Sequence, residues 1–252
     1  MEVSGGPLGG LPVPRRYSLS LIDRHRESPT AMTFRFSTEG TGFSYRSNQA
    51  IRLALPGVAD PWGAARLFSL SSSPTEAGWI AVTCKISDTP FKQALARLAP
   101  GATADVYGPI GAFVLNTSRP AVFLAGGIGI TPFRGMLRFA RDTHLEQPVV
   151  LLYSARTPEE LVFRSQLDEI AASAPRTSVH YTITRPEESP QPWAGRVGRI
   201  DAAWIRETVG DVPRPCYYIA GLPEMVASTA RLLQETLSVP EDDIDYEMFR
   251  GF

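Results

Sequence analysis

The sequence contains very little cysteine and histidine. Its two cysteines, Cys84 and Cys216, stand far apart in 252 residues and outside any Cys-x-x-Cys pair. This scarcity excludes iron–sulfur clusters, cysteine-based zinc sites and a disulfide scaffold. The three histidines, His25, His144 and His180, are not at helical ligand spacing, so we expect no metal site.

The sequence also lacks an excess of either charge and any long apolar run. Lys plus Arg number 25 against 26 for Asp plus Glu, which excludes a global field for nucleic acid or anionic membranes. No run approaches the roughly 18 apolar residues of a membrane span. Residues 1–14 are rich in Gly and Pro without the features of a signal peptide. We therefore expect a flexible tail at 1–14, no membrane insertion and a cytoplasmic protein.

Turn-forming residues are abundant, with 22 Pro and 21 Gly. Between these turn residues, the first half of the chain has short runs in which apolar and polar residues alternate, such as Ile80–Ile86. Such runs predict strands with one buried face. Several such strands in about 100 residues are typical of a small antiparallel barrel. Phe91, Ala94, Leu95 and Leu98 recur at helical spacing and predict a single helix among the strands.

The pattern changes after Pro120. Apolar runs at 121–125, 149–153, 179–183 and 217–220 alternate with helical patterns at 132–141, 158–172 and 223–237. This alternation predicts a parallel sheet covered on both faces. The expected fold is thus an antiparallel Greek-key β-barrel followed by an α/β domain with a parallel sheet. We place the barrel at 15–117 and the α/β domain at 118–252.

Two loops are candidates for binding phosphates. Residues 125–132 read AGGIGITP and pass directly from an apolar strand into a helix, and residues 220–223, AGLP, repeat the arrangement later. Glycines allow close backbone approach, and helix N-terminal N–H groups attract anions. Helices also open at Thr89-Pro90, Thr131-Pro132 and Thr157-Pro158. Thr and Pro suit helix capping, which explains these pairs equally well without a ligand, and Thr157 with Glu160 predicts a capping box.

The order of the motifs resembles the ferredoxin–NADP reductase superfamily, in which a flavin-binding barrel precedes a nicotinamide-binding α/β domain. The resemblance extends from about Tyr17 to Phe252. Residues 66–72, RLFSLSS, resemble the family's flavin motif of Arg, any residue, an aromatic and Ser. Residues 107–113, YGPIGAF, resemble its barrel-closing Gly-Pro-x-Gly-x-Phe, and the loops at 126–132 and 220–223 resemble its two nicotinamide loops.

The resemblance implies that the protein binds FAD and NAD(P)H, and it implies a role for each residue of the flavin motif. Phe68 would stack on the flavin, Arg66 would bind its diphosphate, and Ser69 would lie near N5. Alternatively, Phe68 is an ordinary core residue of a strand and Arg66 is a solvated surface residue. Residues 88–92 stand where the family carries Gly-x-x-Ser/Thr at the helix that receives the FAD diphosphate. Because the glycine and the serine are absent, FMN remains an alternative flavin, and FAD is favoured. The remaining flavin contacts are expected at Leu67, Thr83, Lys85, Thr89, Pro90 and Phe91.

For the nicotinamide, the implied contacts lie at the carboxyl ends of the parallel strands. Ala220 stands where many relatives carry Cys. A basic group at the end of the second parallel strand favours the 2′-phosphate of NADPH, whereas a carboxylate there favours the ribose of NADH. This position carries Ser154, Arg156 and Arg164 and no early carboxylate, and with Arg185 they favour NADPH slightly. The other expected contacts are Gly127, Ile128, Gly129, Thr131, Gly221, Leu222 and Pro223.

The sequence ends in Glu247-Met248-Phe249-Arg250-Gly251-Phe252. Some relatives end in Glu, any residue and an aromatic that covers the second flavin face. Phe249 or Phe252 would take that position, and Glu247 would join Ser69 as a catalytic residue in a proton path. An aromatic end strand that closes the sheet explains the same residues equally well.

The expected activity is hydride transfer from NAD(P)H to FAD, followed by electron transfer to a separate acceptor such as ferredoxin, flavodoxin or an oxygenase component. The alternatives are a flavin or ferric reductase with a small-molecule acceptor, and a non-enzymatic adapter that senses redox cofactors. The sequence does not specify the acceptor or the oligomeric state.

Overall fold

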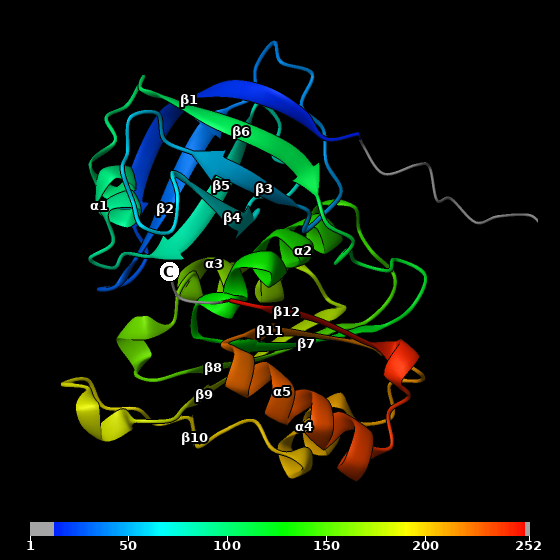
Figure 1. Cartoon of the computed structure of the whole chain (residues 1–252). Coiled ribbons are helices and arrows are strands. Elements are labelled where there is room, and N and C mark those ends of the chain that lie inside the picture. Colours follow the sequence, from blue (N-terminus) through cyan, green and yellow to red (C-terminus); the bar gives the residue numbers. More distant parts are fainter. Residues whose placement is uncertain (1–12, 250–252) are drawn as a thin grey trace, which may run out of the picture.

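The first half of the chain forms a nearly closed barrel of six antiparallel strands (Figure 1). The computed structural model describes residues 13–249, so the predicted tail at 1–14 lies almost entirely outside the described residues. The strand order is β4-β3-β6-β1-β2-β5, and a bridge between Leu70 and Val82 connects the two outer strands. The strands are β1 (Arg15–Arg26), β2 (Ala31–Ser37), β3 (Ala50–Ala54), β4 (Ala65–Ser69), β5 (Trp79–Lys85) and β6 (Thr103–Ile110). The predicted antiparallel barrel is confirmed.

The barrel interior is filled by alternate side chains of its strands. Leu19 and Leu21 of β1, for example, are buried while Ser18 and Ser20 are exposed, as one inward face requires. The one helix, α1 (Pro90–Arg97), adds the buried Phe91 and Leu95 to this core. The Thr89 hydroxyl caps the helix and accepts a hydrogen bond from the Lys92 N–H at 3.4 Å, so this predicted cap is confirmed.

The second half forms a parallel sheet of order β10-β9-β8-β7-β11-β12. Its strands are β7 (Ala121–Gly126), β8 (Val149–Ala155), β9 (Thr177–Ile183), β10 (Arg196–Val197), β11 (Cys216–Gly221) and β12 (Ile244–Met248). Helices α2 (Ile130–Asp142) and α3 (Arg164–Ser173) cover the face toward the barrel, and α4 (Ala202–Val209) and α5 (Pro223–Arg231) cover the other (Figure 1). The predicted doubly covered parallel sheet is confirmed.

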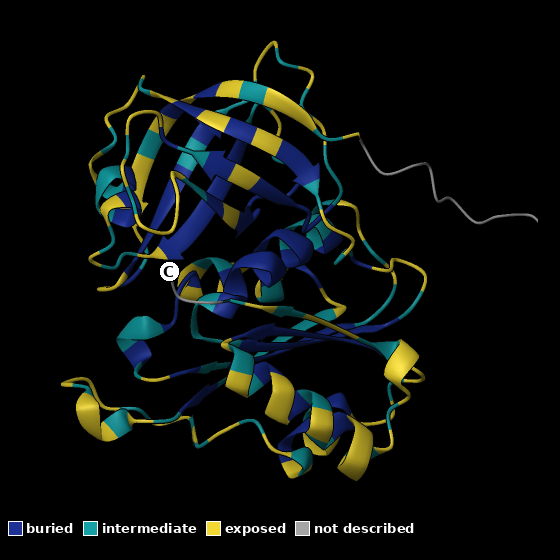
Figure 2. Cartoon of the chain, in the orientation of Figure 1, coloured by how far each residue is buried: buried dark blue, intermediate teal, exposed yellow. Residues whose placement is uncertain are grey.

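Burial on both faces explains why the central strands are uniformly apolar. In β7, Val122 and Leu124 pack with α4 and α5, whereas Phe123 and Ala125 pack with α2 and α3. Figure 2 shows the central strands of this sheet as buried, and β7, β8 and β11 are buried at nearly every position. Since both faces exclude water, every position of the strand favours an apolar residue.

Two predicted helix starts are wrong. The helix expected from Pro158 is only a short 3-10 turn, Pro158–Glu160, and α3 begins at Arg164 because Phe163 adopts a left-handed φ of 65°. The segment 161–163 is buried as a unit, and Tyr153 Oη accepts from the Val162 N–H at 3.1 Å. The Thr157 side chain makes no cap hydrogen bond and Glu160 instead pairs with Lys85, so the predicted capping box does not form.

The start of α2 also differs, because Thr131 lies inside its first turn rather than at the cap. The residue before the helix is Gly129. The Thr131 hydroxyl donates to the Ile128 carbonyl at 3.1 Å. The preceding 3-10 turn, Gly127–Gly129, continues directly into α2, so the helix incorporates the residues that were expected to cap it.

The barrel and the α/β domain are joined by a buried ion pair. Arg134 of α2 bonds Glu76 in the β4–β5 connection, and both side chains are nearly buried. Gln166 of α3 also accepts from Arg134, at 2.8 Å. A Cβ on Gly135 would lie 2.6 Å from the Ser72 carbonyl oxygen. Helix α2 therefore approaches the barrel closely, and this contact fixes the ends of β4 against the parallel sheet.

Among residues 13–249, no helix combines the length and apolar character that a membrane crossing needs.

Candidate functional site

Strand β4 places the residues of the flavin motif in different environments. Arg66 and Phe68 face inward, with 8% and 7% of their surface exposed, whereas Leu67 is 61% exposed on the outer surface. Ser69, at the end of the strand, is buried. This separation follows from the alternation of side chains along a strand. Leu67, one of the expected flavin contacts, lies on the face opposite Arg66 and Phe68.

Arg66 and the first turn of α1 converge on one carboxylate. Arg66 Nη2 lies 2.7 Å from Asp60 Oδ1, and the Phe91 N–H donates to Asp60 Oδ2 at 2.9 Å. Arg66 Nε is buried and has no hydrogen-bond partner among the described residues. The donors are an arginine and a helix N-terminus, the combination that binds phosphate, so their chemistry fits a flavin diphosphate. Sequence reasoning identified both donors but not Asp60, which comes from the preceding loop.

Phe68 packs within the barrel core. Its ring lies 6.2 Å from the Phe91 ring, with 28° between their planes, and the Lys92 ammonium lies 4.7 Å from its centre. Lys92 is only 6% exposed. Burial raises the pKa of the neighbouring Cys84 thiol, although Lys92 opposes this. Stacking of a flavin on Phe68 remains a prediction.

The two expected contacts on β5 have partners within the protein. The Thr83 hydroxyl shares hydrogen bonds with Thr33 at 2.7 Å and with Ser71 at 2.8 Å. Lys85 Nζ lies 3.2 Å from Glu160 Oε2 of the α/β domain. Thr83 therefore bonds within the barrel and Lys85 bridges to the α/β domain, while direct contact of either residue with a cofactor remains a prediction.

The two residues expected to be catalytic lie in direct contact. Ser69 Oγ donates to Glu247 Oε2 at 2.7 Å, although 178 positions separate them in the sequence. Burial raises the pKa of the Glu247 carboxyl, and the weaker effect of the Ser69 hydrogen bond lowers it. The pair joins the end of β4 in the barrel to β12 at the edge of the parallel sheet.

The nicotinamide loops lie side by side at the carboxyl ends of β7 and β11. A Cβ on Gly129 would lie 2.1 Å from the Ala220 carbonyl oxygen, so the two loops touch at a position that only glycine permits. Gly127 has a φ of +54° and nothing within 4 Å of a Cβ position. Its open surface at the start of α2 fits the close approach of a dinucleotide phosphate. Ile128 lies between these two glycines.

The second loop is shaped by Met225. Its Sδ would lie 3.0 Å from a Cβ on Gly221 and 3.1 Å from one on Gly126, so both strand ends pack on this side chain. Leu222 is 60% exposed and Pro223 begins α5. The loop thus offers an apolar edge beside the glycine contact.

Strand β12 connects this loop to the Ser69–Glu247 pair. Ala220 is the register partner of Glu247, and Gly221 is that of Met248. The Phe249 N–H then donates to the Gly221 carbonyl at 2.8 Å. Phe249 is half-buried against the core of the α/β domain, as the end-strand interpretation predicts. Phe252 lies outside the described residues.

The end of β8 is less basic than its sequence indicates. Arg156 is paired with Glu188, with Nη2 2.9 Å from Oε1. Arg185 lies 3.8 Å from Glu187. Arg164 lies 3.9 Å from Asp168 and packs over Tyr181 and Trp193, while Ser154 is half-buried. The sequence has no carboxylate directly after β8, but Glu188 of the β9–β10 connection reaches this strand end and pairs with Arg156. The spacing of residues along β8 does not reveal this contact.

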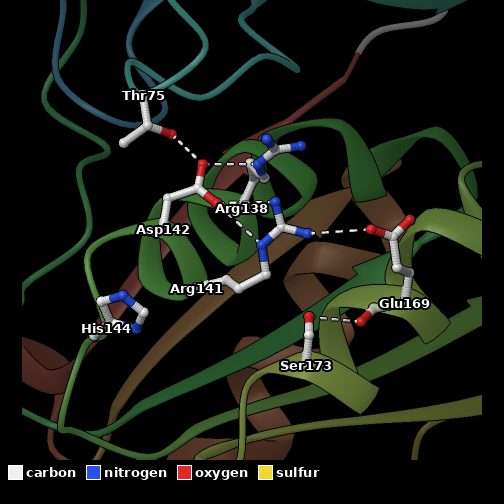
Figure 3. Close-up of a pocket in the computed structure, with 7 residues that line it drawn as sticks. All are labelled: Thr75, Arg138, Arg141, Asp142, His144, Glu169 and Ser173. Atoms are coloured by element: carbon white, nitrogen blue, oxygen red, sulfur yellow. Dashed lines mark hydrogen bonds and ion pairs between the residues drawn. The ribbon is translucent and has the colours of Figure 1, made fainter.

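A shallow depression of about 660 Å³ lies at the far end of α2 (Figure 3). Its charges are paired internally: Asp142 accepts from Arg138 at 2.7 Å, from Arg141 at 2.9 Å and from Thr75 at 2.6 Å. The 13 residues of α2 separate it from Gly129 by roughly 20 Å at 1.5 Å per residue. We therefore assign it to the domain contact. Its lining comprises Thr75, Arg138, Arg141, Asp142, His144, Glu169 and Ser173.

Within the described part of the chain, no group of three or more His, Cys, Asp or Glu side chains lies close enough together to hold a metal ion. Both cysteines are buried and unbridged.

Comparisons with known proteins agree with this architecture. Residues 123–231 match the family model of the oxidoreductase NAD-binding domain. The chain is 32% identical over 221 residues to ferredoxin–NADP reductase B of Sorangium cellulosum, which covers 84% of this chain and 88% of that protein. It is 28% identical to the glycine betaine monooxygenase reductase subunit of Chromohalobacter salexigens, over 78% of this chain and 54% of that protein.

Among solved structures, the Amycolatopsis cytochrome P450 reductase GcoB superposes with a TM-score of 0.80 at 21% identity, over 95% of this chain and 71% of that one. This likeness shows the shared fold. Together with the matched sequence, the two touching glycine loops and the Ser69–Glu247 pair, it leads to one conclusion. The chain belongs to the ferredoxin–NADP reductase superfamily of NAD(P)H-dependent FAD oxidoreductases.

Proposed function

We propose that this chain takes hydride from NAD(P)H onto FAD and passes the electrons to a separate protein acceptor. The observation that carries the proposal is the Ser69–Glu247 hydrogen bond of 2.7 Å. It joins the flavin motif of the barrel to the strand that lies beside the second nicotinamide loop. A reaction between two cofactors needs both binding sites to meet at one point, and the contact supports such a meeting of the two motifs.

The residues of the chain would hold the two cofactors and a proton. Arg66 and the N-terminus of α1 would bind the flavin diphosphate, and Gly127 with the start of α2 would receive the nicotinamide diphosphate. When bound, FAD accepts hydride from NAD(P)H and releases the electrons to an acceptor. Glu247 Oε2 accepts a hydrogen bond from the Ser69 hydroxyl. Because burial raises the pKa of Glu247, this carboxyl is suited to holding a proton near the flavin.

The first test is spectroscopic. Protein reconstituted with FAD should lose its yellow flavin absorbance when NADH or NADPH is added without oxygen. Heat-denatured protein with the same FAD serves as the control for free flavin. Protein that binds no FAD, or that stays yellow with both nucleotides, would contradict the proposal.

The acceptor is proposed from the relatives. One is named a ferredoxin–NADP reductase and another a monooxygenase reductase subunit. The two cysteines of this chain are too few for the four thiolates of a common iron–sulfur cluster. We therefore expect turnover with ferredoxin or flavodoxin to exceed turnover with free flavin or ferric chelates. Higher kcat/KM with the small acceptors would instead favour a flavin or ferric reductase.

Nucleotide choice should respond to Glu188. The Glu188→Gln variant frees Arg156 for a 2′-phosphate, so the ratio of kcat/KM for NADPH to that for NADH should rise. The side chains are 61% and 38% exposed, so we expect a change of only about threefold to tenfold. Steady-state kinetics with both nucleotides measure it. Glu207→Gln, which removes an exposed carboxylate from α4, should leave the ratio unchanged, and an equal shift in both variants would refute the assignment.

A further inference from the structure

The loop between β3 and β4 holds an anion of the protein itself on the donors assigned above to the flavin diphosphate. Asp60 Oδ2 accepts the Phe91 N–H at 2.9 Å, and Oδ1 lies 2.7 Å from Arg66 Nη2. Oδ1 also accepts the Trp62 N–H at 2.8 Å. The Asp60 side chain is 0% exposed and that of Arg66 only 8%. A carboxylate is thus enclosed between an arginine and a helix N-terminus.

This carboxylate is ionised at neutral pH. Burial raises the pKa of Asp60, but hydrogen bonds from Phe91, Trp62 and Arg66 outweigh burial and hold it below its ordinary value. A flavin diphosphate on the same donors would bring a second negative charge into contact with it. Like charges at such a distance repel strongly in a water-poor site. Both anions therefore cannot bind the same donors together.

Arg66 Nη2 bonds Asp60 and Nη1 bonds the carbonyls of Trp62, Gly63 and Ala65, which leaves Nε as the unsatisfied nitrogen. Both carboxylate oxygens are used, and Arg66 Nε is left buried without a partner in the described structure. Buried guanidinium N–H groups normally have a partner. A diphosphate offers more acceptor oxygens than a carboxylate, so it can bond Nε in addition to the groups that Asp60 occupies.

Displacement of the loop would leave the β3–β4 ladder intact and would break the Arg66 Nη1 bonds to the Trp62 and Gly63 carbonyls. Its ends are joined where the Leu55 N–H donates to the Ala64 carbonyl at 3.1 Å, beyond the last pair of the β3–β4 ladder. Gly57 and Gly63, with φ values of +78° and +85°, have nothing within 4 Å of a Cβ position. Rotation at these glycines can withdraw Asp60 while the flavin motif on β4 stays in register.

We propose that Asp60 is an internal competitor of the flavin diphosphate, so that FAD binds only when the 56–63 loop withdraws this carboxylate. The inference rests on the proposed function and adds to it a residue that sets flavin affinity. The opposite role is that Asp60 orients Arg66 for the flavin. The two roles predict changes of affinity in opposite directions.

The test is a titration of flavin-free protein with FAD, followed by flavin fluorescence or calorimetry. In Asp60→Asn and Asp60→Ala, the Kd for FAD should fall by about tenfold or more, because the competing negative charge is removed. Riboflavin, which has no phosphate, should bind all forms alike. Asp105→Asn, which removes an exposed charge from β6, is the matched control, and circular dichroism verifies folding of each variant.

Hydrogen exchange gives a readout that does not depend on affinity. Amides of residues 56–63 should exchange faster when FAD is added to the wild type, while those of α4 should not change. An unchanged or higher Kd for FAD in both Asp60 variants would overturn the proposal and favour an orienting role. Failure of the wild type and both variants to bind FAD would overturn the proposed function as well.

Discussion

Replacing Glu247 by Gln should slow reoxidation of the reduced flavin by a one-electron acceptor about 100-fold, the scale of a lost acid or base group, because the flavin gives up its N5 proton in that step. Glutamine can still accept the Ser69 hydrogen bond of 2.7 Å, but it cannot take up a proton. Stopped-flow absorbance without oxygen measures the rate directly. Glu235→Gln, on the exposed surface after α5, should be reoxidised at the wild-type rate.

The same variant should be more stable than the wild type at neutral pH. Burial raises the pKa of Glu247 above its ordinary 4.5, so the folded protein holds this proton more tightly than the unfolded chain. The favourable contribution is complete below the ordinary pKa and is lost as the pH rises through the raised folded value. Thermal unfolding from pH 4 to pH 8 should therefore show a Tm advantage for Glu247→Gln that grows with pH.

The Ser69→Ala variant distinguishes a proton-holding role of the Ser69–Glu247 pair from a purely structural one. The Ser69 hydrogen bond lowers the pKa of Glu247, so its loss should move the corresponding limb of the pH–rate profile to higher pH. Identical pH profiles for Ser69→Ala and the wild type, or a Glu247→Gln variant with normal rate, would rule out a proton-holding role.

The second large effect is expected at Gly129. In Gly129→Ala, the new Cβ would lie 2.1 Å from the Ala220 carbonyl oxygen and 2.7 Å from the Gly221 nitrogen. Both contacts are to backbone, so one nicotinamide loop must move away from the other. We expect a loss of about 3 kcal/mol in the free energy of unfolding, at the upper end of overpacking costs, and a large rise in the KM for NAD(P)H.

Gly127→Ala is the matched comparison in the same loop. A Cβ there meets open space, and the cost is limited to the positive φ of 54°, about 1 kcal/mol. Denaturant unfolding of both variants measures the difference. Equal stability of the two variants would show that the Gly129 contact does not control the spacing of the loops.

Local patterns predicted most of the fold because each depends on neighbours in the sequence. The alternation at Ile80–Ile86 corresponds to β5, and the apolar run at 121–125 corresponds to β7. The predicted helix at 158–172 failed for a non-local reason. Residues 161–163 are drawn into the core as a unit, and the Tyr153 hydroxyl bonds the freed Val162 N–H.

The candidate site depended more heavily on long-range contacts. The flavin motif and the glycine loops were visible as motifs, and the resemblance paired Ser69 with Glu247. The charged partners were not predictable, because Asp60, Glu188 and Lys92 reach Arg66, Arg156 and Phe68 from other segments. Solvated charge and paired charge look the same in a sequence, and only the packing of loops distinguishes them.

The scarcity of cysteine and histidine by itself predicted a protein without metal clusters or disulfides. The alternating and continuous apolar runs by themselves predicted a barrel followed by a parallel sheet. The tertiary structure decided which anion Arg66 holds, how closely Gly129 approaches Ala220 and that Ser69 meets Glu247. The physical reason is the distance along the sequence over which each kind of interaction acts. Propensity and periodicity act within a few residues of one element, whereas ion pairs and close backbone contacts depend on how loops fold back and how separate elements pack together.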